Sequence, residues 1–236
     1  MNIKDILDYL TYNELSQHRL GGYSTNGVAN ADIPKIITTI NQGIMEISKR
    51  TDLLHGLVQI DMLENRFLYP MLQKHAVVAG AAMVGDKFIK DSVEAVFPKN
   101  FRKFVHVYTP AGEECELNVR QLAESLAVPS YNTLQVPLSN THTYLLVEFI
   151  YDPAQLTVTN MVEAQATEYP LPPFTVTALY SYVASKMLEG QNTESSRGIA
   201  ELAMQKFEEE IKQIENQNVL IGDMYTSSKF YSNGFV

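Results

Sequence analysis

The stretch DIPKIITTINQGIMEISKRTDLL, residues 32–54, decides the fold because it contains the clearest helical pattern in the chain. Its isoleucines recur mainly at intervals of three and four residues, and this spacing places them on one face of a helix. Asp32 stands at the expected N-cap, Pro34 is tolerated in a first turn, and two basic residues end the pattern where the helix dipole favours cations. The stretch therefore predicts an amphipathic helix over residues 32–51.

Further helices are predicted on either side of it. Toward the N-terminus a weaker apolar pattern covers residues 3–16, and the loop-like segment LGGYSTNGVANA, residues 20–31, separates it from the first helix. Toward the C-terminus a pair of prolines introduces a helix over residues 174–189, and an apolar stripe continues over residues 194–217. The connection between these last two helices is short, which implies that they pack as an antiparallel pair.

The centre of the chain has the pattern of β-strands. Three segments each read as two strands about a turn: LVQIDMLENRFLYPM at 57–71, KFVHVYTPAGEECELNV at 103–119 and NTLQVPLSNTHTYLLVEFIYDP at 132–153. Residues 144–151 are apolar at almost every position, which is typical of a central strand covered on both faces. Residues 72–97 fit no single pattern and could hold one short helix.

These elements predict an α+β fold in which helices from the two chain ends meet as one antiparallel helical bundle. The bundle would comprise residues 1–55 and 166–220, and an antiparallel β-rich domain over residues 56–165 would be inserted into it. An extended C-terminal tail, residues 221–236, would follow. This tail is aromatic and has few helical signals, so we expect it to fold against a partner, a frayed terminus being the alternative.

The charge of the chain argues against nucleic-acid binding. Eighteen lysines and arginines stand against 27 aspartates and glutamates, a net charge of −9, whereas phosphate binding requires clustered basic residues. The one small basic group, Lys99, Arg102 and Lys103, fits a turn or an edge strand better. No segment reads as a signal peptide or approaches the roughly 18 apolar residues of a membrane span. We therefore expect a protein made in the cytoplasm, with no membrane partner.

No arrangement of residues in the sequence indicates catalysis, a metal site or a cofactor. The five histidines form no H-x-x-x-H pair, and neither the glycine-rich phosphate motifs nor the G-x-S-x-G elbow occurs. The acidic groups at 86–94, 113–116 and 208–210 lack the spacing of a calcium loop and read as solvated charge. The single cysteine, Cys115, has glutamates beside it that would raise its thiol pKa, which argues against a nucleophile. We expect no enzyme activity.

Six motifs follow one another along nearly the whole chain. Their order resembles that of the head-to-tail adaptor proteins of tailed bacteriophages, also called head-completion or tail tubular proteins, in the version with a β-rich domain inserted between its helices. The motifs are ILDYLTYNEL at 6–15, TINQGIMEISKRTDLL at 39–54, RFLYPM at 66–71, YNTLQVP at 131–137, YPLPPFTVTALYSYVASKM at 169–187 and KFYSNGFV at 229–236.

The resemblance implies a structural virion protein located at the head–tail junction and made in the host cytoplasm. Its subunits would form a homo-oligomeric ring, a dodecamer in that family, beneath the portal protein. Tail tube or nozzle proteins would bind the other side, and genomic DNA would pass through the lumen during genome ejection without sequence-specific binding. The tail would anchor in the portal through the portal-binding residues Lys229, Phe230, Tyr231, Asn233, Gly234, Phe235 and Val236.

Two other functions are compatible with the sequence. A receptor- or carbohydrate-binding virion protein would act through the β-rich insertion and would need a concave aromatic surface among its tyrosines, Tyr108, Tyr131, Tyr144 and Tyr151. A hydrolase would need a site assembled from distant histidine, aspartate and serine residues. The ring adaptor differs from both because it predicts a C-terminal segment that only a partner orders.

Overall fold

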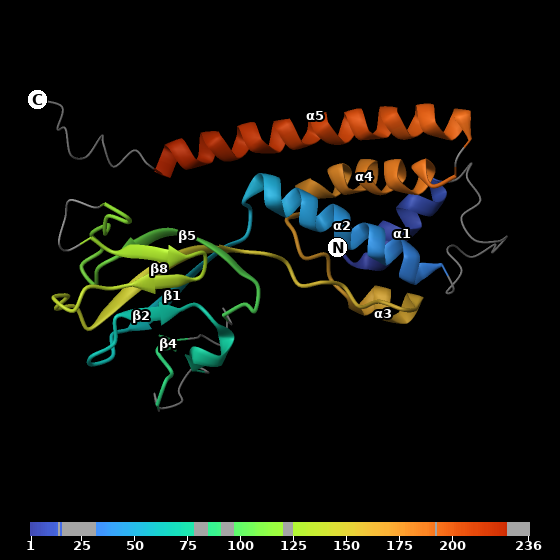
Figure 1. The fold of residues 1–236 in the computed structure, drawn as a ribbon. Coiled ribbons are helices and arrows are strands. Elements are labelled where there is room, and N and C mark those ends of the chain that lie inside the picture. The colour runs from blue at the N-terminus through green and yellow to red at the C-terminus, as the bar shows by residue number, and fades with distance from the viewer. Residues whose placement is uncertain are drawn as a thin grey trace, which may run out of the picture. The chain divides into compact units, whose positions relative to one another are not determined.

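The computed structural model describes residues 1–13, 15, 32–77, 85–90, 97–119, 125–191 and 193–225, with side chains as far as residue 216. These residues form a mixed α+β chain with five α-helices and two β-sheets (Figure 1). The chain divides into two compact units. Met1–Leu53 and Pro153–Val236 form a helical unit, and Leu54–Asp152 forms a β-rich unit. The helical unit thus takes its residues from both chain ends, and the β-rich unit comes from one continuous segment.

Helix α1 (Ile3–Tyr12) begins at a reciprocal cap. The Asn2 side chain accepts a hydrogen bond from the backbone N–H of Asp5 at 2.9 Å, and the N–H of Asn2 donates to the Asp5 carboxylate at 3.1 Å. Two donors that the first turn would leave unpaired are satisfied in this way. The predicted range of 3–16 is too long at its C-terminal end, although Leu15 is still buried beyond the helix.

Helix α2 (Ile33–Thr51) confirms the prediction from the opening stretch. Its six isoleucines are at most 3% exposed, so the spacing read from the sequence is the buried face of the helix. Asp32 occupies the N-cap position, but its side chain makes no capping hydrogen bond among the described residues, contrary to expectation. Burial of Ile33 and the fixed backbone of Pro34 account for where the helix begins.

Helix α4 (Val176–Glu189) approaches α2 closely at Gly43. A Cβ atom at Gly43 would lie 2.7 Å from Cδ1 of Leu179 and 2.9 Å from Cδ1 of Tyr182. These distances are shorter than packed carbon atoms adopt, so the glycine permits the two helices to approach. No sequence pattern indicates this contact, because a glycine inside a helical pattern is expected only to weaken the helix.

Helix α5 (Glu194–Tyr225) has 32 residues and packs against α4 (Figure 1). The predicted end at residue 217 and the predicted extended tail from residue 221 are wrong at this boundary, because the helix continues through Tyr225. Gly222 lowers helix propensity by about 1 kcal/mol without ending a helix. The buried stripe of this helix starts at Ala200, whereas Ile199 beside it is exposed. Its members are Ala200, Ala203, Phe207, Ile211 and Ile214.

Side-chain contacts join the first and last parts of the sequence within the helical unit. Arg50 Nη1 lies 2.9 Å from Glu208 Oε1, and Arg50 Nε lies 3.6 Å from Glu215 Oε1. The rings of Tyr9 and Tyr180 stack with their centroids 4.0 Å apart. Glu208 is therefore an ion-pair partner, whereas the sequence assigned it to solvated charge.

A short helix that the sequence analysis missed, α3 (Met161–Ala166), precedes the proline-rich 3₁₀ turn η2 (Pro173–Thr175). The Asn160 side chain caps α3 by accepting from the N–H of Glu163 at 2.9 Å. Beyond it, the hydroxyl groups of Tyr169 and Thr175 lie 2.7 Å apart in the core, and burial raises the pKa of Tyr169 to about 12. This buried pair fixes the segment that leads into α4.

The β-rich unit contains two sheets. The larger has the order β3–β4–β1–β8–β5 and the smaller has the order β2–β7–β6, and every pairing is antiparallel except β3 with β4. The strands of the larger sheet are β1 (His55–Asp61), β3 (Ala76–Val77), β4 (Ile89–Lys90), β5 (Phe101–Tyr108) and β8 (Tyr144–Tyr151). Those of the smaller sheet are β2 (Leu68–Pro70), β6 (Ala127–Ser130) and β7 (Thr133–Gln135).

Strands β1, β2, β5, β7 and β8 lie in the segments that the sequence predicts, whereas β3, β4 and β6 fall outside them and no strand forms over residues 109–119. Two of the three predicted pairs do not form. Strands β1 and β2 flank one turn and belong to different sheets, as do β7 and β8. At the end of β5 the chain does fold back, and Tyr108 forms an antiparallel bridge with Glu114. A turn signal shows where the chain reverses but does not select the partner of each strand.

Strand β8 is interior in its sheet, between β1 and β5, as predicted. Its two faces differ, however. Leu145, Val147 and Phe149 are at most 2% exposed, whereas Leu146 and Glu148 on the other face are half-buried. The second face is thus covered less completely than the first, although Ile150 on it is 3% exposed. In the described part of residues 72–97, the turn η1 (Gln73–His75), β3 and β4 stand in place of the short helix considered possible.

We predict that Gly56→Ala destabilises the β-rich unit by about 1–3 kcal/mol, because it overpacks the core. Gly56 faces Phe149 across the β1–β8 pair. A Cβ atom there would overlap the aromatic ring, with two further ring carbons at 2.9 Å. Urea denaturation measures the change. The control is Gly198→Ala in α5, where a Cβ meets no atom within 4 Å, so it gains up to about 1 kcal/mol of helix propensity. Equal stability of Gly56→Ala and the unaltered chain would contradict this packing.

We predict that Glu208→Gln lowers the free energy of unfolding at pH 7 by roughly 0.5–1 kcal/mol, a small value because Glu208 is 43% exposed. The hydrogen bond from Arg50 lowers the pKa of Glu208. A lowered carboxyl pKa stabilises the folded chain above the unfolded-state value of about 4.3, and the contribution disappears as pH falls through the folded-state pKa. The difference between variant and unaltered chain should thus vanish in acid. Glu209→Gln, at an exposed neighbour, is the matched control. An equal loss in both variants would argue against the pair.

Candidate functional site

The predicted portal-binding residues lie outside the described residues. Helix α5 ends at Tyr225, and the segment follows beyond it in the sequence. The structure therefore gives these residues no position, and their assignment stays a prediction. They are Lys229, Phe230, Tyr231, Asn233, Gly234, Phe235 and Val236.

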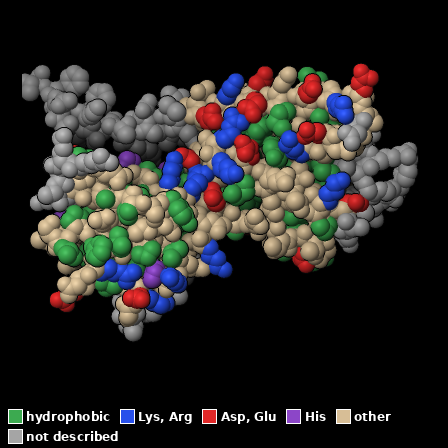
Figure 2. Space-filling model, in the orientation of Figure 1, with side chains coloured by type: hydrophobic (Ala, Val, Ile, Leu, Met, Phe, Trp, Pro, Cys, Tyr) green, Lys and Arg blue, Asp and Glu red, His purple; other side chains and the backbone are tan. Residues whose placement is uncertain are grey.

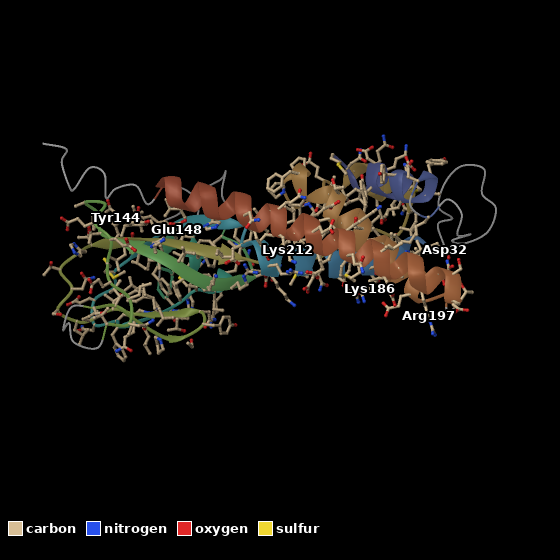
Figure 3. All side chains as sticks on the ribbon, turned by 90° about the horizontal axis from the view of Figure 1, so that it is seen from above. Asp32, Tyr144, Glu148, Lys186, Arg197 and Lys212 are labelled. Carbon is tan, nitrogen blue, oxygen red and sulfur yellow. The ribbon has the colours of Figure 1, made fainter. Side chains whose placement is uncertain are left out.

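The four tyrosines of the receptor-binding alternative do not share one surface. The strand register places Tyr108 and Tyr144 on the half-buried face of the larger sheet. Figure 3 shows Tyr144 on the same strand as Glu148. Tyr131 is 68% exposed at the turn between β6 and β7 of the smaller sheet, and Tyr151 packs against the buried core. The described residues therefore do not form the concave aromatic surface that this alternative requires.

Two histidine–glutamate pairs occupy the half-buried face of the larger sheet. His55 Nδ1 lies 3.1 Å from Glu148 Oε1, and His106 Nδ1 lies 2.6 Å from Glu114 Oε1. No sequence motif predicts these contacts, because the partners are neighbours across strands and not along the chain. The turn after β5 contains Gly112, which has a positive φ, and it brings Glu114 back beside His106. This turn was the one feature of the sequence that could have indicated the His106–Glu114 pair.

His75 and Tyr108 are among the titratable side chains of this unit whose pKa values are shifted, and the structure gives the cause of each shift. Burial lowers the pKa of His75, whose ring stacks on Phe88 and whose Nδ1 lies 2.9 Å from the carbonyl oxygen of Asp86. Burial, followed by the nearby carboxylates of Glu148 and Glu114, raises the pKa of Tyr108. These arrangements are those of a core histidine and of a tyrosine that stays protonated near neutral pH.

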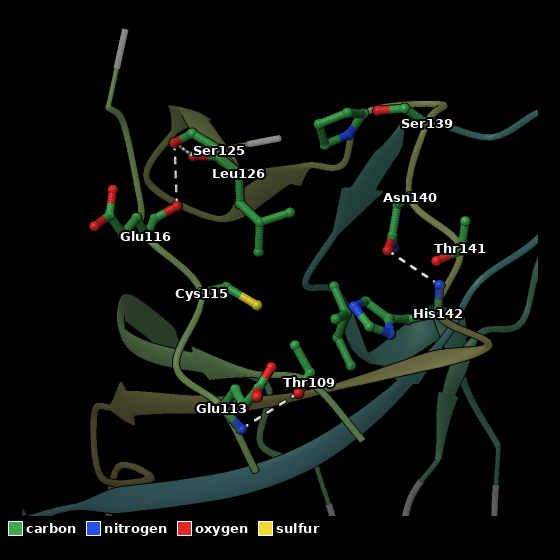
Figure 4. A pocket seen from close by; sticks show the side chains of 12 residues that line it. Thr109, Glu113, Cys115, Glu116, Ser125, Leu126, Ser139, Asn140, Thr141 and His142 are labelled. Atoms are coloured by element: carbon green, nitrogen blue, oxygen red, sulfur yellow. Dashed lines mark hydrogen bonds between the residues drawn. The ribbon is translucent and has the colours of Figure 1, made fainter. Parts of the chain in front are cut away.

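A cleft of about 390 Å³ lies in the β-rich unit beside the turn that follows β5. Its volume is in the range of small-ligand sites. Figure 4 shows Cys115 and Leu126 on one side of it and Asn140 and His142 on the other. The full lining comprises Thr109, Glu113, Cys115, Glu116, Ser125, Leu126, Pro137, Ser139, Asn140, Thr141, His142 and Leu145.

The polar groups of the cleft are not all paired. Glu113 and Glu116 line it and are exposed, and neither forms an ion pair with any described residue, whereas Glu114 between them contacts His106 elsewhere. The Asn140 Oδ1 atom accepts from the backbone N–H of His142 at 3.1 Å, which fixes the amide orientation. Its Nδ2 is shielded from solvent and has no hydrogen-bond partner in the part of the chain that the structure describes. The exposed carboxylates can therefore accept hydrogen bonds, whereas the shielded amide of Asn140 is not open to a ligand.

The acidic groups that the sequence singled out form no metal centre among the described residues. No set of three or more His, Cys, Asp or Glu side chains there is placed to hold a metal ion. Asp86 lies 3.5 Å from Arg66, and the other members of its acidic group, Asp91 and Glu94, fall outside the described ranges. In those same ranges, no helix has the length and apolar character needed to cross a membrane.

The small basic group does not form a charged stripe. Arg102 and Lys103 lie on β5, an edge strand of the larger sheet, and Lys99 just precedes it, which fits the predicted edge-strand role. Arg102 Nη1 is 3.4 Å from Asp152 Oδ1. Figure 2 shows hydrophobic side chains gathered over the β-rich unit on the visible face, and basic and acidic side chains interspersed over the helical unit.

No family model and no curated protein matches the sequence. The chain's own residues are therefore the basis on which its function is inferred.

We predict that the Cys115 thiol reacts slowly and only at elevated pH. Burial, followed by the negative charges of Glu113 and Glu114, raises its pKa, and the thiolate is the reactive form. Iodoacetamide alkylation reports this one thiol, because the chain has no other cysteine. The midpoint of the rate against pH should lie above that of the urea-unfolded chain, and Glu113→Gln should lower it. Glu64→Gln, also exposed, should leave it unchanged. Equal midpoints for folded and unfolded chains would contradict the assignment.

Proposed function

We propose that this chain is a head-to-tail adaptor of a tailed bacteriophage, a structural virion protein and not an enzyme. Its copies form a ring between the portal protein and the tail or nozzle. The observation that carries the proposal is the order of six motifs from residue 6 to residue 236, which resembles that family. The two-unit division supports it, because a continuous β-rich segment at 54–152 separates two parts of one helical unit.

The ring body in this proposal is a helical bundle to which both chain ends contribute. The close approach at Gly43 and the Arg50–Glu208 ion pair support it, because they join α2 to α4 and to α5. Helix α5 adds length: at 1.5 Å per residue, its 32 residues form a rod of about 48 Å. A rod of this length offers neighbouring subunits an extended surface on which to pack.

The anchor in this proposal is the segment 229–236, which begins a few residues after the end of α5. An aromatic segment that gains order only on binding has to offset its loss of conformational entropy with contacts to the partner. Binding would therefore depend on a completed portal ring, which supplies all of the contacts. The receptor-binding alternative has less support, because its four tyrosines do not share a surface.

The passage of DNA is the remaining element of the proposal. A ring of chains that each carry a net charge of −9 repels phosphate where its acidic side chains line the lumen. On α5, Glu209 is exposed and available for this role, whereas Arg50 partly neutralises Glu208.

We predict that deletion of Phe230–Val236 leaves DNA-filled heads that do not acquire tails, because the adaptor loses its portal contacts. Electron microscopy of particles from an infection supplied with the variant chain measures the fraction with tails. Ser227→Ala together with Ser228→Ala changes the same region without removing an aromatic side chain and should allow normal tailing. Normal tailed particles from the deletion variant would rule out the anchor.

A further inference from the structure

We propose that residues 73–77 form a clasp that acid releases: protonation of His75 detaches this segment from β4 and uncovers Phe88. The clasp consists of the turn η1 and strand β3, which is an edge strand of the larger sheet. The inference does not rest on the adaptor function, because every group that takes part lies within the β-rich unit.

The backbone contacts between the clasp and β4 are few. Strand β3 pairs with β4 over two residue pairs, and a pairing this short contributes little by itself. The backbone N–H of Phe88 donates to the carbonyl oxygen of His75 at 3.0 Å, and Nζ of the positively charged Lys87 donates to the carbonyl oxygen of Ala76 at 3.1 Å. The side-chain contacts of His75 therefore carry a large share of the attachment.

The His75 side chain contacts the other side of this boundary in two ways. It is 7% exposed, its ring stacks on that of Phe88 with the centroids 4.8 Å apart, and its Nδ1 lies 2.9 Å from the carbonyl oxygen of Asp86. A carbonyl oxygen only accepts hydrogen bonds, so Nδ1 carries the proton of the neutral ring and Nε2 takes up the second proton in acid. The hydrogen bond to Asp86 survives protonation, and the effect of acid lies in the added charge.

The surroundings of the ring oppose a positive charge on His75. The Arg66 guanidinium already lies against the Phe88 ring, with its Cζ 4.4 Å from the centroid. One cation is attracted to an aromatic ring, but a second cation against the same ring is repelled by the first. Lys74, the neighbour of His75 in the sequence, adds a further positive charge. The Asp86 carboxylate lies 3.5 Å from Arg66 Nη1 and is 90% exposed, so water screens its compensating charge.

These contacts set the direction of the pH dependence. Burial lowers the pKa of His75, the hydrogen bond to the Asp86 carbonyl opposes this, and Arg66 and Lys74 lower the pKa further. In the released segment the ring meets water and regains its ordinary pKa of about 6.5. The clasp therefore has its full stability above about pH 6.5 and weakens as the pH falls below that value, because the released state binds a proton more readily. Release uncovers Phe88, which is 0% exposed in the closed arrangement.

The test is amide hydrogen exchange of the full chain labelled with ¹⁵N, expressed as protection factors so that the pH dependence of the exchange chemistry cancels. Between about pH 8 and about pH 5 we expect the Phe88 amide to lose protection by about threefold or more. The Val136 amide, which donates to the carbonyl oxygen of Phe67 at 2.8 Å, should keep its protection because the clasp opens locally. Constant protection of Phe88, or an equal loss at Val136, would overturn the proposal.

Variants assign the pH dependence to one ring. His75→Gln removes the ionisable group but keeps an amide that can donate to the Asp86 carbonyl, so the protection of Phe88 should become independent of pH. His142→Gln, at an exposed histidine of the same unit, should behave as the unaltered chain does. Arg66→Met removes the facing charge and should shrink the loss, because protonated His75 is then better tolerated. A loss unchanged in His75→Gln or, should that variant not fold, in Arg66→Met would refute the clasp.

Discussion

The antiparallel pairing of β1 with β8 is the constraint on which the rest of the structure depends. Seven consecutive residue pairs, from His55–Ile150 to Asp61–Tyr144, join the first and last strands of the β-rich unit. Because the two strands run antiparallel, the chain enters and leaves this unit at adjacent points. The N–H of Tyr151 donates to the carbonyl of Leu54 at 3.1 Å just where the unit begins. Adjacent ends allow the sequences before and after the unit to pack in one helical unit.

Burial of apolar side chains, and not ion pairing, stabilises the helical unit. Burying one isoleucine side chain contributes roughly 1.5–3 kcal/mol, and α2 alone buries six of them. A part-exposed pair such as Arg50–Glu208 contributes at most about 1 kcal/mol. The ion pair is therefore the smaller contribution, and the burial of apolar side chains is the larger one. In the β-rich unit the same role belongs to a buried aromatic cluster that includes Phe97, Phe101 and Phe149.

Local features of the sequence predicted local structure, and long-range contacts were beyond its reach. The isoleucine spacing predicted α2 because a helix records its buried face within a few residues. The patterns of residues 57–71, 103–119 and 132–153 located five of the eight described strands, but the pairing of β1 with β8 depends on residues far apart in the chain. The glutamates beside Cys115 are its neighbours in the sequence, so they indicated the direction of its pKa shift, although burial is the larger cause. The sequence did not predict the cleft, because the residues of its two walls, near Glu113 and Asn140, are far apart in the chain.

The proposed adaptor role connects these features: a helical body, a β-rich unit with a polar cleft, and a C-terminal segment that follows a long helix. The most direct test of this role is sedimentation velocity of the purified chain, alone and mixed with the portal ring of the same phage. We predict a slowly sedimenting monomer alone and a complex of many copies with the portal. A chain that stays monomeric beside the portal ring would contradict the proposed assembly.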